Sequence, residues 1–461
     1  MRLLAIIAVL AAFPGLYWAL GFPRARRWIF IAAGALPILY EPLHLGASLV
    51  SWALWPGYVR GLSLTIVDAI AVAICLRYGR GRPVPALLWA FVIYIVCLTP
   101  SALLASFHVP AVFVLFQVFR VTLFFYAVYL ATLNGQLLRI AEGLAIAAMA
   151  NGAVSAYHSL SGAVQAEGIL GHQNLSGMAT NLCVPILLAL ALRTRRPLFI
   201  AGVAAAVIGA LAGGSRATMI LLAMAMLGTL AATMIVRPSG RTILISALAL
   251  IGLLASAPFA AHKLTERNVA GFDLDPERLA FDRTAELMIK DHPWGAGLNQ
   301  YVSVANTAGY FDRAGVRWGY DARSTNVHNV YLLVRAEAGL LGLCGLLIWL
   351  LSPILLAASC LFRRRLPLRE VTIASGFALV GVALHSRYEW VLVTATPQYL
   401  VALCIGVIAA LSVYPTPTAT SNRSKRAPIE YDPVGRCMRS LEPSSRVLQE
   451  ESKTHERGSA G

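Results

Sequence analysis

Residues Leu340–Leu356 read LLGLCGLLIWLLSPILL, a run without a charged side chain, and a second apolar run covers Ile243–Phe259. A helix needs roughly 20 apolar residues to cross the hydrocarbon core of a bilayer, so each run is a candidate membrane span. Mean hydropathy over the chain is +0.69. Only 13% of the 461 residues are charged, against about 25% in typical soluble domains. The sequence therefore predicts an all-α polytopic membrane protein, since a membrane β-barrel would show short alternating segments instead.

Basic clusters in short loops give the orientation of the predicted spans, because Arg and Lys concentrate on the cytoplasmic side. The clusters are Arg24–Arg27, Arg77–Arg82, Arg193–Arg196, Arg237–Arg241 and Arg363–Arg369. An even number of apolar runs lies between each cluster and the next, so one orientation satisfies all of them. Two runs, about residues 28–45 and 61–76, lie between the first two clusters. With Arg2–Leu20 interpreted as a retained helix rather than a signal peptide, the chain has about 13 transmembrane helices, with 12 as the alternative.

The even number of spans between basic clusters predicts four parts in the chain. Residues 1–260 and 327–414 are predicted to hold transmembrane helices, and residues 261–326 a long external loop with short helices. Residues 415–461, rich in Pro, Ser, Arg and Glu, are predicted to be a disordered cytoplasmic tail. The net charge of +16 is explained by loop arginines and predicts no nucleic-acid partner. The seven cysteines show neither a disulfide framework nor metal-ligand spacing.

Four polar motifs interrupt the apolar sequence, and the span count places all of them on the external side. They are Gly171-His172-Gln173-Asn174, Gly214-Ser215-Arg216-Ala217, Arg283 with His292-Pro293-Trp294-Gly295-Ala296-Gly297, and His328-Asn329. Arg and His side chains are costly at a membrane edge and are often functional there. Their convergence on one face predicts a reaction centre.

Simpler interpretations exist for the charged residues. Ser215-Arg216 suits a turn with an arginine at lipid phosphates. Arg283 lies three residues before Glu286, a spacing that favours an ion pair on one helix. Arg387 and Glu389, near an external helix end, are predicted to pair locally. Ion pairs of this kind are common on exposed surfaces, so these alternatives stay open.

Helix ends give interpretations for the remaining motif residues. Asn174 is a candidate helix cap beside an incidental His172. Ser324-Thr325-Asn326 is predicted to cap the next helix, with His328 in its first turn. The positive end of the helix dipole would then keep the His328 ring neutral and basic. Arg335, seven residues further on, would fall on the same helical face as His328, where snorkelling or pairing is the alternative to a role in the site.

The long external loop is predicted to contain a helix that starts at Asp275-Pro276-Glu277 and runs to about Lys290. The loop is also rich in aromatic residues, which suit contact with carbohydrate or anchoring at the membrane interface. They include Tyr301, Tyr310, Trp318 and Tyr320.

The ordered motifs resemble those of the O-antigen ligase and Wzy-type polymerase superfamily. These are Gly-His-x-Asn, Ser-Arg, an Arg upstream of His-Pro-x-Gly-x-Gly, and His-Asn-x-x-Leu with a later Glu-x-Gly, over roughly Gly168–Gly345. The resemblance implies a GT-C-like fold in the bacterial inner membrane with its active site facing the periplasm. It implies an inverting, metal-independent glycosyltransferase without a cofactor, which moves a glycan from undecaprenyl diphosphate to an acceptor hydroxyl.

By motif position, the resemblance implies that His328 is the catalytic base and that Arg216 and Arg283 bind the diphosphate. Permanently charged, bidentate Arg side chains can meet the charge of that leaving group, and no metal ligand is expected. Supporting residues are expected at Ser215, His172, Asn174, Asn329 and Arg335.

The predicted activity is polymerisation of O-antigen or exopolysaccharide, with ligation to lipid A core as the alternative. A transporter or flippase of lipid-linked glycans is the alternative of another class, although the chain shows none of the internal repeats that many transporters have. Predicted partners are the undecaprenyl-diphosphate-linked donor, a glycan or lipid A core acceptor, membrane lipids, a flippase and a chain-length regulator.

Overall fold

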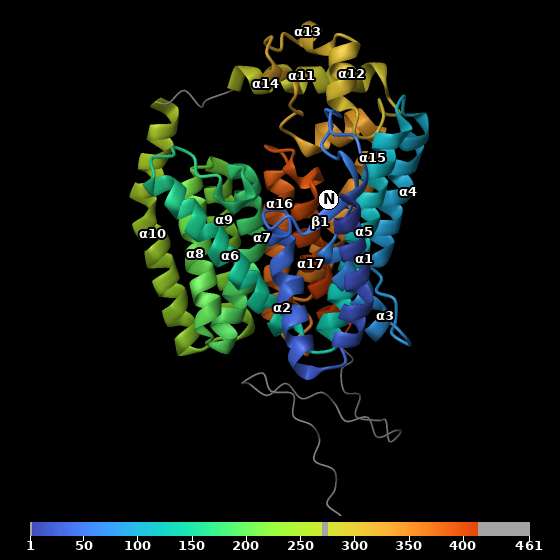
Figure 1. Ribbon diagram of the computed structural model, residues 1–461. Helices are drawn as coiled ribbons and strands as arrows, with labels where there is room; N and C mark the ends of the chain where they lie inside the picture. The colour runs from blue at the N-terminus through green and yellow to red at the C-terminus, as the bar shows by residue number, and fades with distance from the viewer. Residues whose placement is uncertain (1, 270–274, 414–461) are drawn as a thin grey trace, which may run out of the picture. The chain divides into compact units, whose positions relative to one another are not determined.

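The computed structural model describes residues 2–269 and 275–413. They belong to one compact unit, Met1–Thr416. A second unit, Pro417–Gly461, lies outside the described residues. The predicted tail, residues 415–461, also lies outside them. Within these ranges the structure is almost entirely helical, and long helices stand side by side in a bundle (Figure 1). The prediction of an all-α polytopic membrane protein is confirmed.

The helices follow the apolar runs of the sequence. The first half holds α1 (Arg2–Ala19), α2 (Pro23–Leu39), α3 (Ile66–Tyr78), α4 (Leu88–Leu104), α5 (His108–Leu133), α6 (Leu137–Leu160), η1 (Gly168–Leu170), α7 (Gln173–Thr194), α8 (Pro197–Gly213) and α9 (Arg216–Val236). The second half holds α10 (Gly240–Val269), α11 (Asp275–Asp291), α12 (Tyr301–Thr307), α13 (Tyr310–Ala314), α14 (Tyr320–Arg323), α15 (Val330–Ser359), α16 (Arg369–His385), η2 (Val391–Val393) and α17 (Ala395–Ser412).

Seven helices among the described residues are long and apolar enough to cross a membrane. They are α5, α6, α7, α9, the Thr242–His262 part of α10, α15 and α17. Helices α4 and α8 are apolar but shorter. The predicted total of about 12–13 spans therefore requires the shorter helices to cross as well. Helix α10 continues to Val269, beyond the predicted end of the first helical part at residue 260.

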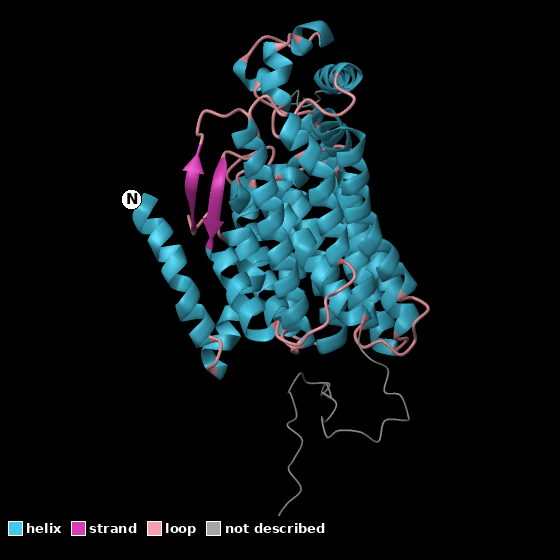
Figure 2. Ribbon diagram, turned by 90° about the vertical axis from the view of Figure 1, so that its right-hand side faces the viewer, coloured by secondary structure: helices cyan, strands magenta, loops and turns pink. Residues whose placement is uncertain are grey.

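A two-stranded antiparallel hairpin joins α2 to α3 and was not predicted. Strand β1 (Gly46–Ser51) pairs with β2 (Gly61–Thr65), and Figure 2 shows the hairpin beside α1. The predicted span at 61–76 is therefore wrong at its start, because its first residues form β2 and α3 begins only at Ile66. Thr65 ends the strand and caps α3, since its hydroxyl accepts the Asp68 N–H.

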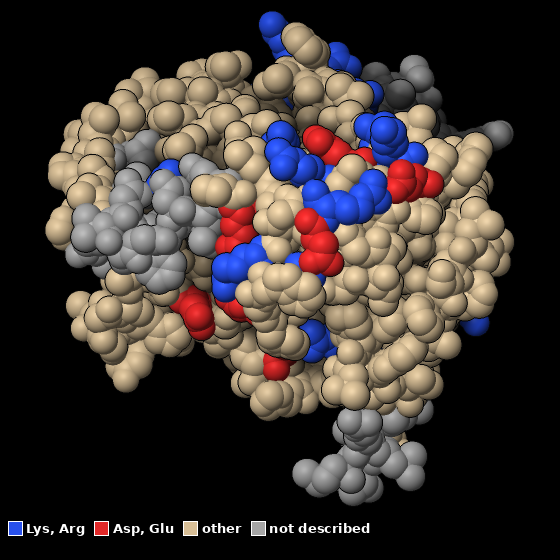
Figure 3. Space-filling model, turned by 90° about the horizontal axis from the view of Figure 1, so that it is seen from above, with Lys and Arg blue, Asp and Glu red and all other residues tan. Residues whose placement is uncertain are grey.

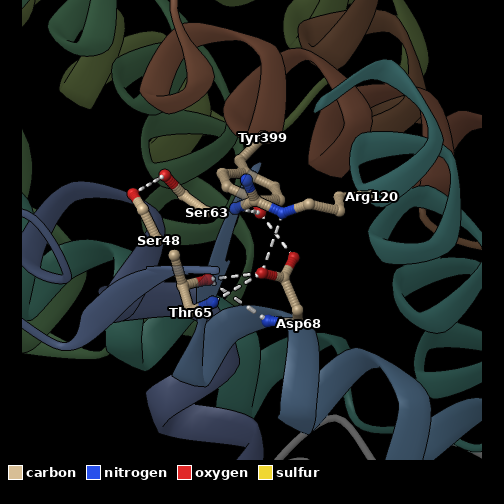
Figure 4. A network of polar contacts seen from close by, with 6 residues as sticks. All are labelled: Ser48, Ser63, Thr65, Asp68, Arg120 and Tyr399. Atoms are coloured by element: carbon tan, nitrogen blue, oxygen red, sulfur yellow. Dashed lines mark hydrogen bonds and ion pairs between the residues drawn. The ribbon is translucent and has the colours of Figure 1, made fainter. Parts of the chain in front are cut away.

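A buried charge network ties the hairpin and three helices together (Figure 4). The Asp68 carboxylate in α3 accepts hydrogen bonds from Arg120 Nε in α5 at 2.9 Å and from the Tyr399 hydroxyl in α17 at 2.6 Å. It also accepts from the backbone N–H and hydroxyl of Thr65, at 2.8 and 2.9 Å. A buried charge is tolerated when it is paired and hydrogen-bonded, so the network fixes these elements relative to one another.

The segment predicted to be an external loop is held to the bundle by Glu337 in α15. This side chain is fully buried, and its carboxylate accepts the backbone N–H groups of Asn299 at 3.0 Å and Tyr301 at 2.8 Å. The Tyr58 hydroxyl, from the loop before β2, donates to the same carboxylate at 2.8 Å. One carboxyl group therefore satisfies donors from two loops that would otherwise be buried without partners.

The Gly-x-Gly end of the His-Pro motif lies backbone to backbone against α15. Gly297 N–H donates to the Glu337 carbonyl at 3.0 Å. A Cβ on Gly295 would lie 2.3 Å from that carbonyl oxygen and 2.7 Å from Gly339 N. Gly339 itself has φ +64 and interrupts the helical geometry of α15. These motif glycines therefore allow a close approach of two backbones, which a side chain would prevent.

We expect Glu337→Ala to destabilise the protein, because it leaves two backbone N–H groups buried without acceptors, at a cost of about 1–3 kcal/mol each. The measurement is thermal unfolding of the purified protein in detergent. Arg335→Ala is the matched control, since that side chain is exposed on the same helix and its removal should leave the midpoint unchanged. Equal midpoints for Glu337→Ala and wild type would show that Glu337 does not anchor the loop.

Candidate active site

Glu389 lies at the centre of a polar cluster at the end of the bundle that carries α11–α14 (Figure 1). It follows α16 and is only 2% exposed. One carboxylate oxygen contacts His328 Nδ1 at 3.2 Å, and the other accepts from Asn174 Nδ2 at 2.5 Å and Arg278 Nη2 at 3.2 Å. Burial raises the pKa of Glu389, but the hydrogen bond and charge of His328, with the charge of Arg278, bring it below its usual value. The cluster thus holds an ionised carboxylate.

His328 lies ahead of a helix rather than inside its first turn. The predicted cap at Ser324-Thr325-Asn326 is wrong, because α15 begins at Val330 and its N-cap is Asn329, whose side chain accepts two N–H groups of the first turn. The Val330 N–H also donates to the Ser386 carbonyl at 2.9 Å, which fixes the start of the helix against the end of α16. His328 therefore meets the Glu389 carboxylate instead of the first-turn N–H groups.

The contact with Glu389 determines which nitrogen of His328 is available for chemistry. An ionised carboxylate can only accept, so Nδ1 carries a proton and donates it in this hydrogen bond. In the neutral ring, Nε2 then bears the lone pair. The side chain remains 21% exposed, which leaves room for another group to approach it.

The Gly-His-x-Asn motif also reaches the cluster. His172 caps the helix and Asn174 contacts the cluster, which reverses the predicted roles of the two residues. His172 is the N-cap of α7, because its Nδ1 accepts the Asn174 N–H at 3.2 Å. Asn174, predicted to be the cap, instead extends its side chain to Glu389. Burial lowers the pKa of His172, which favours the neutral ring that this cap requires. The expected local pairing of Glu389 is likewise replaced by contacts with three other elements.

Helix α11 begins at Asp275 as predicted, but its two arginines lie in different surroundings. Arg278 contacts Glu389, and the Phe281 ring lies 6.0 Å from the His328 ring. Arg283 is exposed and makes no hydrogen bond or ion pair with the described residues, so the expected pair with Glu286 is not formed. The structure therefore brings Arg278 rather than Arg283 into contact with the cluster.

Arg278 was not singled out from the sequence, although a signal for it exists. It shares one helical face with three buried apolar residues, whereas Arg283 lies on the opposite, exposed face of the helix. Those residues are Phe281, Ala285 and Met288. Glu389 could not be found in this way, because it is distant in sequence from every residue that it contacts.

Arg216 is the first residue of α9 and is half-buried. Gly214, with φ +62, ends α8, and the Ser215 hydroxyl caps α9 by accepting the Thr218 N–H at 3.4 Å. The first turns of α9 and α7 touch, since a Cβ on Gly177 would lie 2.1 Å from the Thr218 hydroxyl oxygen. The motif thus places Arg216 at the end of the bundle where the His172 motif begins α7.

Arg335 lies apart from the cluster. Its expected place on the face of His328 assumed a continuous helix from Val327, but α15 starts only at Val330. The seven-residue spacing therefore no longer corresponds to two helical turns. Arg335 is exposed, and within the described chain it has neither a hydrogen bond nor an ion pair to His328 or Glu389.

The arrangement combines a histidine held by a carboxylate, one arginine beside that pair and a second arginine at a neighbouring helix start. A histidine oriented in this way can accept a proton, and arginines can bind an anionic group. The site therefore suits transfer chemistry in which a hydroxyl loses a proton while an anion departs.

Comparison with known proteins finds a family that this region resembles. A family model described as O-antigen ligase matches residues 201–350, which include Arg216, α11 and His328. No curated protein matches the chain. The match confirms the resemblance to the O-antigen ligase and Wzy-type superfamily that the motifs predicted. The part of the chain that carries Arg216, Arg278 and His328 is therefore similar to the O-antigen ligase family.

Proposed function

We propose that this protein transfers a glycan from undecaprenyl diphosphate to a sugar hydroxyl at the periplasmic face of the bacterial inner membrane. The observation that carries the proposal is the His328–Glu389 pair, with Arg278 beside it, at one end of an apolar helix bundle. The family match supports ligase or polymerase chemistry in general. Within that chemistry we favour polymerisation, in which the acceptor is itself a lipid-linked glycan.

His328 serves as the general base in this proposal. Glu389 holds Nδ1–H, so Nε2 accepts the proton of the acceptor hydroxyl as its oxygen attacks the anomeric carbon. The bond from that carbon to the diphosphate oxygen breaks, and the diphosphate leaves with the electron pair. Attack from the side opposite the leaving group inverts the anomeric centre. Glu389 also stabilises the imidazolium that forms, as a carboxylate does in other histidine-based sites.

Two arginines stabilise the departing diphosphate. Arg216 lies at the start of α9, where the helix dipole also favours an anion. On α11 we propose Arg278, because it is already beside the base; Arg283, assigned from motif order, is the alternative. One guanidinium N–H group of Arg278 donates a hydrogen bond to Glu389. The remaining N–H groups can bind phosphate oxygens. Fixed cations of this kind meet the leaving-group charge, so the proposal includes no metal.

We expect Arg216→Lys and Arg278→Lys each to slow transfer by about 10- to 100-fold, because a lysine cannot reproduce charge-assisted bidentate contacts worth about 1.5–3 kcal/mol. Arg283→Lys is the matched control and should stay near wild type. The measurement is turnover of purified protein with a defined lipid-linked oligosaccharide. A large loss in Arg283→Lys with a normal Arg278→Lys would instead support the motif-based assignment.

Replacing the base should separate binding from chemistry. We expect His328→Ala to bind the lipid-linked donor normally and to transfer its glycan about 10²–10⁴-fold more slowly. Glu389→Gln should also slow turnover, since it removes the charge that stabilises the imidazolium, and His172→Ala should have a milder effect. Normal turnover in His328→Ala would exclude it as the base, and lost donor binding in a folded variant would make it a diphosphate ligand. Product length in the same assay separates polymerisation from transfer to a lipid A core acceptor.

The proposed orientation has its own test, motivated by α7. This helix runs from its N-cap His172 in the cluster to a basic end, where Arg193 in its last turn pairs with Glu370. Ala308→Cys, exposed after α12 in a chain without its natural cysteines, should react with a membrane-impermeant thiol reagent in cells whose outer membrane is permeabilised. Arg364→Cys, in a basic loop, should react only after the inner membrane is lysed. The opposite labelling pattern would reverse the orientation.

A further inference from the structure

Two aromatic side chains are presented to solvent on the external loop. Trp318, between α13 and α14, is 77% exposed, and Tyr320, at the start of α14, is 87% exposed. Other aromatic residues of the loop are buried in its core, among them Tyr301, Tyr310 and Phe311. The loop therefore has an apolar core of its own and does not need Trp318 or Tyr320 to complete it.

The Trp318 ring is held in place by Arg323. The guanidinium carbon lies 3.6 Å from the ring centroid, so the charge covers one ring face. Arg323 is itself fixed, because it pairs with Asp312 at 2.6 Å and donates to the Val316 carbonyl at 3.2 Å. Its side chain is only 9% exposed. A rigid ring with one covered face and one open face loses little conformational entropy when a ligand stacks on the open face.

A short series of contacts connects this ring to the reaction centre. Arg317, next to Trp318, pairs with Asp321 at 2.6 Å and lies 3.6 Å from the Glu277 carboxylate in α11. The next residue of α11 is Arg278, which contacts Glu389. Figure 3 shows basic and acidic side chains side by side on this face of the molecule. The residue next to the exposed Trp318 therefore contacts α11, the helix that contributes Arg278 to the cluster.

We propose that Trp318 and Tyr320 form a saccharide-binding platform that holds sugar units of the glycan beside the reaction centre. Sugar rings have an apolar C–H face that stacks on an aromatic ring and a rim of hydroxyls. Arg317 and Asp321, with side chains 59% and 70% exposed, supply donors and acceptors for those hydroxyls at the edge of the platform. The platform gives the transferase of the proposed function its contact with the glycan, and its identity as a saccharide site rests on that function.

Location favours a saccharide over a lipid as the occupant. Helices α13 and α14 lie beyond the end of the long helices in Figure 1, on the side away from the apolar bundle. Charged side chains flank the ring, whereas aromatic anchors at a membrane lie beside apolar residues that enter the bilayer. Membrane anchoring is therefore an outcome that the experiment must be able to detect.

The test uses the full-length protein in detergent and two readouts. The probe for the first is the repeat-unit oligosaccharide, released from its diphosphate lipid by mild acid, with affinity measured by calorimetry. Trp318→Ala should weaken binding about 3- to 10-fold, in keeping with the modest worth of one aromatic contact, and Trp318→Phe should retain part of it. Tyr320→Ala is a second variant at an exposed position. Trp294→Ala is the matched control, since Trp294 is 67% exposed in the His-Pro motif, where the segment packs against α15, and it should bind as wild type.

The second readout is transfer from the lipid-linked donor, which separates the platform from the proposed function. If wild type transfers glycan while the Trp318 and Tyr320 variants bind the oligosaccharide normally, the platform is wrong and the transferase stands. If the variants lose oligosaccharide binding although wild type shows no transfer, the platform stands and the transferase fails. If Trp318→Ala lowers binding of the protein to lipid vesicles without sugar but leaves oligosaccharide affinity unchanged, Trp318 is a membrane anchor and the proposal is overturned.

Discussion

The buried carboxyl group of Glu337 controls how the segment that carries α11–α14 meets the long helices of the bundle. It accepts backbone N–H groups at the point where the chain leaves the His-Pro motif and enters α12. Since a buried carboxyl group would be unfavourable without hydrogen-bond partners, loop and helix stabilise each other. The loop also contains α11, so this contact fixes one end of the segment that delivers Arg278 to Glu389. The same helix, α15, begins two residues after His328, and the proposed base and the proposed diphosphate-binding Arg278 therefore depend on one support.

Glu389 has a comparable role inside the cluster, but its partners are side chains. Without a carboxylate, Arg278 and His328 would face each other as donors or cations with no acceptor between them. Glu389 keeps them together before any substrate arrives and sets the orientation of the His328 ring. In the proposed reaction, an arriving diphosphate would bring negative charge close to this carboxylate, so the arginines would have to offset this repulsion as well as bind the leaving group. That requirement suits Arg, whose charge persists at any physiological pH and whose several donors can serve two anions at once.

The sequence predicts the helical framework well because apolar runs of membrane-spanning length are a strong signal. It also predicts that the four motifs lie at one end of the bundle, and the structure places His172, Arg216 and His328 there. Arg278 lies on the buried apolar face of α11 and Arg283 does not. The order of the motifs alone does not separate the two residues. The pairing of His328 with Glu389 depends on how α15 and α16 pack, and no local pattern encodes it. The β1–β2 hairpin was missed because its strands are short and adjoin apolar runs that resemble span ends.

The motifs of this region separate into two physical roles. The glycines of the His-Pro-x-Gly-x-Gly motif, Glu337 and Gly339 act through the backbone, since they allow and satisfy one close approach between loop and helix. Arg216, Arg278 and His328 are proposed to act through their side chains; the two arginines lie on helices α9 and α11, and His328 precedes α15. Substitutions in the first group should alter activity by displacing α11, whereas substitutions in the second should alter it with the fold intact. A loss of activity in this protein therefore identifies a chemical role only when the position of the loop relative to α15 is shown to be unchanged.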